Sequence, residues 1–159
     1  MVHRSLAISA AVAATVCALA IGSPAGQAAG RSQTLILFDK PVSITLTHAD
    51  GTVVSHAPYP DAKPGDTLDV NSLDYRGTHS RHSKRWIGST HLRCKFNGPG
   101  APDCESHVAL GGSLLVFTGN PGKVTNGTGI YQGASGRVTS VKQVANDASD
   151  IVARIQLRN

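Results

Sequence analysis

After residue 30, hydrophobic and polar residues alternate in short runs, and no segment there has the periodicity of an amphipathic helix. Glycine, proline, aspartate and asparagine separate the runs, which is typical of an all-β barrel or sandwich. We expect one antiparallel barrel of eight strands, because closing the sheet removes its exposed edges. The eight expected strands are Gln33–Phe38, Pro41–His48, Asp66–Tyr75, Arg85–Phe96, Glu105–Leu110, Ser113–Thr118, Gly136–Val144 and Asp150–Leu157.

The alternation also predicts which side chains face the core. The run from 85 to 96 is largely apolar on the face that holds Trp86 and Leu92, and polar on the other face. In the run from 66 to 75 the alternation slips, since Leu68 and Val70 share one face whereas Leu73 and Tyr75 share the other. We therefore expect a β-bulge near residues 71–72. The last run places one apolar face toward the core, formed by Ile151, Ala153, Ile155 and Leu157.

The first 30 residues are interpreted as a targeting segment. His3 and Arg4 give a basic start, an apolar run follows from Leu6 to Ile21, and small residues around Ala28 suit a signal peptidase. A transmembrane anchor needs about 20 apolar residues, and this run is shorter and rich in alanine. We therefore expect a secretory signal peptide over 1–28 and a secreted, extracellular domain over 29–159 that has no membrane association after cleavage.

Cysteine usage fits an extracellular domain. Loss of the signal peptide would remove Cys17 and leave Cys94 and Cys104, and an even count in an oxidising compartment indicates a disulfide. The turn-rich segment 97–102 lies between them, and cross-strand neighbours can be close enough to be bridged. We expect a disulfide-closed hairpin, which should contribute about 2–3 kcal/mol of stability on the chain-entropy model.

The chain is basic, with 15 Lys and Arg against 10 Asp and Glu, and much of the excess lies in Arg76–Arg85. Such a run could bind nucleic acid, but it has no aromatic platform before Trp86 and secretion would separate it from that partner. A solvated loop is preferred, so we expect no nucleic-acid partner. His79 and His82 lack a nearby third ligand, so we expect no metal. The sequence has no nucleotide-binding, Gly-x-Ser-x-Gly or zincin motif, and we expect no cofactor.

The most distinctive stretch runs from Asn126 to Gly136 and interleaves four glycines with β-forming residues. A phosphate-binding loop is one interpretation, but no Lys-Ser/Thr follows and no helix pattern begins after it. The preferred interpretation is a tight connection between two barrel strands, with Ile130 and Tyr131 packed inward.

This stretch resembles the Gly-Gly-Thr-Gly-x-Tyr/Phe-x-Gly-Ala-x-Gly signature of dirigent proteins and allene oxide cyclase-like barrels, with Asn126 in place of the first glycine. Over most of residues 33–157 the chain is similar to secreted bacterial members of this group. The run Arg76–Arg85 departs from it by being several residues longer than the usual turn. The other matching features, in order, are Gly65-Asp66, Leu73-Asp74-Tyr75, Gly88, Cys94, Cys104 and Gly112–Gly119.

The resemblance implies an eight-stranded barrel, often a trimer, with a cavity for a hydrophobic small molecule at one mouth. Characterised plant members guide cyclisation or radical coupling by shape, with few polar groups. By this resemblance we expect the chain to bind an apolar small molecule and, if it is an isomerase-like or dirigent-like enzyme, to steer its cyclisation or stereoselective coupling. A carrier without turnover and an extracellular interaction protein remain open alternatives. A homotrimer or homodimer is expected.

Asp39 is the first candidate catalytic residue. It ends the first expected strand, shares a face with Leu35 and Leu37, and matches the acidic position that helps to protonate a reactive intermediate in dirigent proteins. A carboxyl at an apolar barrel mouth has its charged form disfavoured, which suits a general acid. The alternative is a turn residue before Lys40-Pro41.

Asn71 and His107 complete the candidate catalytic set. Asn71 matches a cavity asparagine of the cyclase, or it satisfies the backbone of the expected bulge. His107 is at strand spacing from Glu105, and the pair could shuttle a proton or lie on the solvent-exposed face. Cys94 falls where the cyclase has a cavity cysteine, but a disulfide would leave no thiol for chemistry. The expected ligand-binding residues are Leu37, Leu73, Tyr75 and Tyr131.

Overall fold

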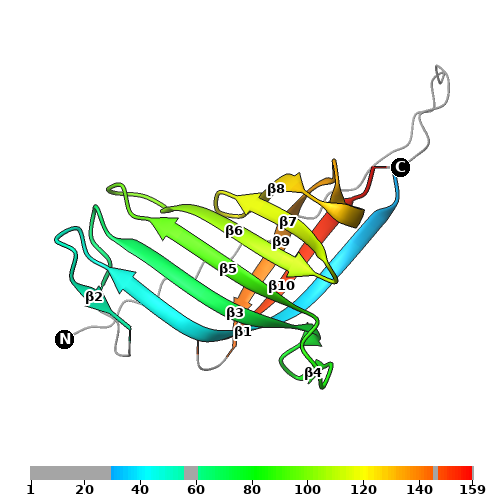
Figure 1. Ribbon diagram of the computed structural model, residues 1–159, viewed down its shortest axis with the longest axis horizontal. Coiled ribbons are helices and arrows are strands. Elements are labelled where there is room, and N and C mark those ends of the chain that lie inside the picture. Colours follow the sequence, from blue (N-terminus) through cyan, green and yellow to red (C-terminus); the bar gives the residue numbers. More distant parts are fainter. Residues whose placement is uncertain (1–29, 56–60, 145–146, 159) are drawn as a thin grey trace, which may run out of the picture.

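The computed structural model describes residues 30–55, 61–144 and 147–158, so the expected signal peptide over 1–28 lies outside the described residues. The described chain is almost entirely β-structure (Figure 1). Its elements are β1 (Ser32–Thr47), β2 (Val53–Val54), β3 (Thr67–Thr78), β4 (Arg81–His82), β5 (Gly88–Lys95), β6 (Asp103–Leu110), β7 (Ser113–Thr118), β8 (Lys123–Gly127), the 3-10 helix η1 (Gly129–Tyr131), β9 (Ser135–Gln143) and β10 (Ser149–Gln156).

Eight of these strands close into an antiparallel barrel, in the order β1-β10-β9-β8-β7-β6-β5-β3, with β3 pairing back to β1. The two-residue strands β2 and β4 extend the sheet beside β1 and β3. The predicted all-β fold and eight-stranded barrel are therefore confirmed. Among the described residues no helix is long and apolar enough to cross a bilayer.

The strand β1 closes the barrel. Residues 32–39 pair with β10 and residues 37–47 pair with β3, so one strand replaces the two that the sequence predicted over 33–48. The register shifts between Pro41 and Ser43, and the extra residue, Val42, is 62% exposed. Proline has no backbone N–H to donate to a neighbouring strand. The bulge interrupts the regular hydrogen bonds between the strands, which is why Pro41 fits inside β1. The expected bulge is thus on β1, opposite residues 71–72, and not on β3 itself.

The strand β8 was not predicted. It is short and mostly exposed, with Val124 half-buried and Gly127 buried, so it carries little apolar alternation. The number of barrel strands still agrees with the prediction because β1 merges two expected strands and β8 adds one. The expected strand over 85–96 begins at Gly88, which leaves Trp86 outside it and 60% exposed.

One end of the barrel is filled by apolar side chains and closed by the glycine-rich connection. Leu115, Tyr131 and Ile155 are almost fully buried there. Glycine is required at 127 because a Cβ would overlap the backbone of Tyr131, and Gly129 has a φ of +59°. The stretch is therefore the tight connection expected from the sequence. The prediction that both Ile130 and Tyr131 pack inward is correct only for Tyr131, because Ile130 is 65% exposed.

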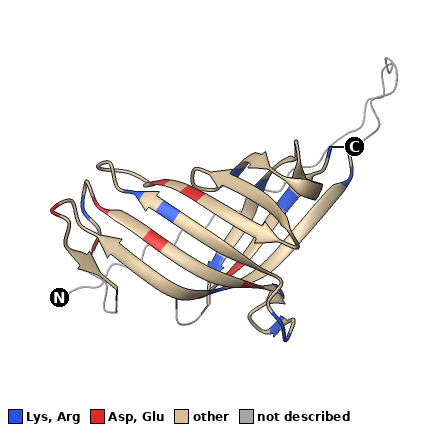
Figure 2. Ribbon diagram, viewed as in Figure 1, with Lys and Arg blue, Asp and Glu red and all other residues tan. Residues whose placement is uncertain are grey.

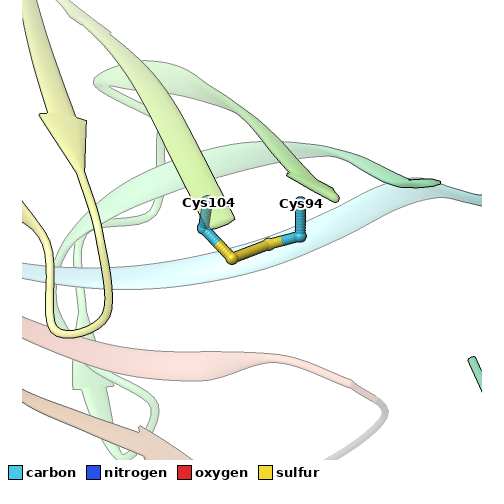
Figure 3. Close-up of a disulfide and its surroundings, with 2 residues drawn as sticks. All are labelled: Cys94 and Cys104. Carbon is cyan, nitrogen blue, oxygen red and sulfur yellow. A yellow bond between two sulfur atoms is a disulfide. The ribbon is translucent and has the colours of Figure 1, made fainter. Parts of the chain in front are cut away.

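The hairpin of β5 and β6 lies toward the other end. Cys94 and Cys104 are directly opposed across these strands, with Cα atoms 4.1 Å apart, and form the predicted disulfide (Figure 3). Their bond closes the hairpin whose turn spans residues 96–102.

Candidate functional site

A cavity of about 340 Å³ lies inside the barrel, a volume typical of pockets that hold small ligands. It extends from the filled end toward the turn between β7 and β8, the residues before β10 and the disulfide. The walls are strongly apolar because every second residue of each barrel strand points inward. The apolar side chains that define the walls include Leu35, Leu37, Val70, Leu92, Val108 and Phe117.

Two carboxyl groups lie side by side at one wall of this cavity. Asp39 of β1 and Asp74 of β3 are direct cross-strand partners on the inner face. Asp39 lines the cavity and is 8% exposed, whereas Asp74 does not line it and has no exposed surface. Cross-strand partners have Cβ atoms about 4.5–5.5 Å apart, so the two side chains are within reach of each other. We call these two residues the carboxyl pair.

The polar neighbours of the carboxyl pair come from the inner faces of β3 and β5. Thr90 of β5 donates its hydroxyl proton to Asp74 Oδ2 at 2.9 Å. Ser72 of β3 donates to the carboxylate of Asp39. Asp74 Oδ1 is buried and has no hydrogen-bond partner among the described residues while both carboxyls are ionised. A proton held between the two aspartates would satisfy this oxygen, since an unpaired buried acceptor is unfavourable.

Burial raises the pKa of both aspartates. For Asp39, hydrogen bonds from Ser72 and Asp74 partly oppose the effect of burial on the pKa. For Asp74, burial raises the pKa to about 7; the hydrogen bond from Thr90 opposes this rise, and the negative charge of Asp39 adds to it. Below about pH 7 Asp74 therefore holds a proton, and its hydrogen bond to Asp39, which lowers the pKa of Asp39, makes Asp74 the donor and Asp39 the accepting carboxylate. Paired carboxyls of this kind can take up and return protons.

Of the predicted catalytic and ligand-binding residues, Leu37 and Asp39 line the cavity, which the predicted disulfide residue Cys104 also borders. Asn71 lies on the outer face of β3, where its Nδ2 donates to Ser43 Oγ at 3.0 Å beside the bulge of β1. His107 is also on the outside, with Nε2 2.6 Å from Glu105 Oε1 and both side chains about half exposed. The structure therefore does not bring Asn71 and His107 together with Asp39.

The remaining predicted ligand-binding residues do not line the cavity either. Leu73 is half-buried on the outer face of β3. On the same face the ring of Tyr75 packs against Phe38, with centroids 6.0 Å apart. Tyr131 belongs to the filled end, and burial raises the pKa of its hydroxyl.

Sequence reasoning missed Asp74, Ser72 and Thr90. A signal was present, because strict alternation from Leu68 and Val70 through β3 places Ser72 and Asp74 on the inner face. The assumed slip in that run assigned the inner face to other residues. The bulge is on β1, so β3 alternates without interruption opposite it.

The basic run Arg76–Arg85 forms an ordered hairpin of β3 and β4, which we call the basic hairpin. Ser83 fixes it, since its N–H donates to the Arg76 carbonyl at 2.9 Å and its hydroxyl accepts from the Arg76 N–H at 3.1 Å. The rings of His79 and His82 cover Phe38, at centroid distances of 5.3 and 4.8 Å. These histidines therefore take part in packing on the outside of β1.

No family model and no curated protein sequence matches this chain. Solved structures do match it, and one of them is pyocyanin demethylase, with a TM-score of 0.56 and 18% sequence identity. The similarity covers 79% of this chain and 99% of that chain. At this identity the likeness establishes the fold alone, a barrel that the two proteins share.

Proposed function

We propose that the mature chain is a secreted barrel that binds an apolar small molecule in its cavity and catalyses an isomerisation, such as a cyclisation, by proton transfer at Asp39. The observation that carries this proposal is the carboxyl pair at the wall of an apolar cavity. The resemblance to allene oxide cyclase-like barrels supports the same function. Pyocyanin demethylase, which has the same fold, is named for a small-molecule substrate.

Electrostatics sets the order of the proton transfers. While Asp74 holds the shared proton the pair carries one negative charge, and burial together with the charge of Asp39 raises the pKa of Asp74 and so disfavours loss of that proton. Uptake of a proton from the ligand leaves two neutral carboxyls. We therefore infer that a ligand C–H or O–H bond breaks first and its proton moves to the Asp39 carboxylate. The pair then returns a proton to a different ligand atom.

The apolar walls would contribute by confining one conformer of the ligand and by excluding water from the carboxyl pair. Asp39 would be the catalytic residue because it touches the cavity. Asp74 would be a positioning residue, which holds the shared proton and is itself held by Thr90.

Replacement of Asp39 tests this function. Native mass spectrometry of the secreted chain would first identify any co-purified compound and the number of subunits, which addresses the expected homotrimer or homodimer. With that compound or a close analogue, Asp39→Ala should retain binding and lose about 10²–10⁴-fold in turnover, the usual contribution of an acid–base group. Asp69→Ala, on the outer face of β3, is the matched control and should keep full turnover.

The two outcomes separate an enzyme from a carrier. If the unmodified protein binds the compound and leaves it unchanged, the enzymatic proposal is wrong and a carrier with the same cavity remains. If Asp39→Ala turns over the compound as fast as the parent, proton transfer at Asp39 is excluded.

A second candidate function, the capture of an anionic partner, is favoured by the basic hairpin. Arg81, Lys84 and Arg85 are exposed and make no ion pair with any described residue, and Figure 2 shows this basic segment projecting from one edge of the barrel. An ordered, unpaired basic projection suits a polyanion. Its charge can be removed without touching the cavity.

Elution from a polyanionic resin tests this second function. Replacing Arg81, Lys84 and Arg85 by glutamine should lower the salt concentration needed for elution. A control with glutamine at Arg137, Lys142 and Arg154 of β9 and β10 changes the net charge equally. Equal elution of the two variants would reject the hairpin as the binding surface.

A further inference from the structure

The charged side chains that line the cavity are all acidic. Asp39 forms part of the wall, Asp147 lies at the edge before β10, and no described Lys, Arg or His lines the cavity. Arg76 is on the inner face of β3, but its side chain is exposed at the filled end, where its charge acts on Tyr131. The negative charge of the carboxyl pair is therefore not balanced by a basic residue in the described cavity.

An unbalanced buried charge is unfavourable, because the apolar surroundings replace water poorly. The hydroxyls of Ser72 and Thr90 donate hydrogen bonds to the pair but bring no positive charge. An occupant with a positive charge at Asp39 would supply the missing counter-charge. An occupant with a carboxylate would instead place a second negative charge in the same apolar space.

We propose that the cavity selects an apolar ligand with a protonated nitrogen, such as an arylalkyl amine or a protonated heteroaromatic base, whose N–H group binds the Asp39 carboxylate, and that it discriminates against carboxylate ligands. This inference rests on the proposed function, since it assumes that the cavity holds a ligand. A cation also suits the proposed reaction, because removing a proton from it leaves a neutral ligand beside a neutral carboxyl pair.

A series of three probes with one skeleton tests the charge preference. Naphthylmethylamine, naphthylmethanol and naphthoate share an apolar ring system and are cationic, neutral and anionic near neutral pH. Isothermal titration calorimetry on the intact mature protein should give an amine affinity about tenfold to hundredfold above that of the alcohol, as expected for a hydrogen bond to a charged group. The carboxylate should bind more weakly than the alcohol.

Two variants test whether the preference for the amine over the alcohol depends on the carboxyl pair. Asp39→Asn should bind amine and alcohol with similar affinity, whereas Asp69→Asn on the outer face should keep the preference. The comparison of the three probes on the unmodified protein needs no variant, so the inference can be tested even if Asp39→Asn does not fold.

The possible failures are distinguishable. Equal affinity for the three probes would overturn the charge preference and leave small-molecule binding intact. Tightest binding of naphthoate would overturn it in the opposite direction. Absence of binding by all three probes would overturn both this inference and the proposed binding function.

Discussion

Two aspartates on the same strand have opposite electrostatic environments. Asp74 faces the interior of the barrel, where burial raises its pKa to about 7. Asp69 faces outward and lies 2.7 Å from Arg93 Nε and 3.2 Å from His91 Nε2. Partial burial tends to raise the pKa of Asp69, but the hydrogen bonds and charges of Arg93 and His91 outweigh it and lower the pKa.

Alternate residues of β3 face opposite sides of the barrel wall, so the side on which an aspartate lies decides whether its pKa is raised or lowered. Residues of both charges are cross-strand neighbours on β3, β5 and β6 (Figure 2), where Asp69 pairs with Arg93 and Arg93 with Glu105, and solvent screens the exposed Arg93. The inner face holds two carboxyls and no described cation at the cavity wall. A proton can therefore be stored inside the barrel, whereas the lowered pKa of Asp69 keeps that outer carboxyl ionised near neutral pH.

The largest expected effect is on the pH dependence of stability. Because the pKa of Asp74 is raised from its usual value to about 7, the native state binds more protons than the unfolded state between about pH 4 and 7. The free energy of unfolding should therefore fall as pH rises through this window. Asp74→Asn mimics the protonated form and should remove this fall, which amounts to roughly 2–4 kcal/mol. Urea unfolding at a series of pH values measures it.

Asp69→Asn provides the control of opposite sign. The lowered pKa of Asp69 contributes stability that is present above its unfolded pKa and is lost as pH falls through the folded pKa. The difference in unfolding free energy between the parent and Asp69→Asn should thus grow as pH rises. Parallel pH profiles for Asp74→Asn and Asp69→Asn would contradict the comparison.

The second expected effect concerns Thr90. Thr90→Val keeps the side-chain shape but removes the hydroxyl that donates to Asp74 Oδ2. Leaving a buried carboxyl oxygen without its donor should lower the free energy of unfolding by about 1–3 kcal/mol. The pKa of Asp74 should also rise further, because this hydrogen bond lowers it. Chemical denaturation and carboxyl-carbon NMR titration measure the two changes, and an unaltered titration would disprove the assigned contact.

The smallest expected effect is on the outer face. Arg93→Gln removes the charge that holds the pKa of Asp69 down, so that pKa should rise toward its usual value. The side chain of Arg93 is 57% exposed, so stability should change much less than in Thr90→Val. Denaturation at low and high salt checks this, since the small loss should disappear at high salt. A loss as large as that of Thr90→Val would show that the outer pair is not screened.

Hydrophobic alternation predicted much of the fold because most barrel strands have one buried and one exposed face. Ile151, Ala153 and Ile155 of β10 face inward as expected. The strand β8 escaped prediction because its pairing with β7, and not a periodic apolar face, defines it. The bulge was assigned to the wrong strand. On β3 the apolar residues change from one face to the other after Val70, which was interpreted as a bulge on β3, whereas the extra residue is on the neighbouring strand β1.

The site was predictable only in part. Asp39 was identified from a resemblance and from its position after Leu37, both of which are local features. The partner Asp74 is contributed by a distant strand, and the shared proton depends on the register between β1 and β3. The bulge at Val42 shifts the register of β1 against β3 by one residue, and the sequence alone did not locate it.

The double pairing of β1 has a consequence for the stage of folding at which the carboxyl pair forms. Leu37, Phe38 and Asp39 are the residues of β1 that are paired on both sides, to β10 and to β3 at once. Asp39 thus sits at the point where the first and last parts of the chain are joined. A partly assembled chain that lacks the β1–β3 junction does not place Asp39 beside Asp74, and one that lacks the β1–β10 junction leaves the barrel open. The proposed activity should therefore emerge together with cooperative completion of the ring and not gradually during folding.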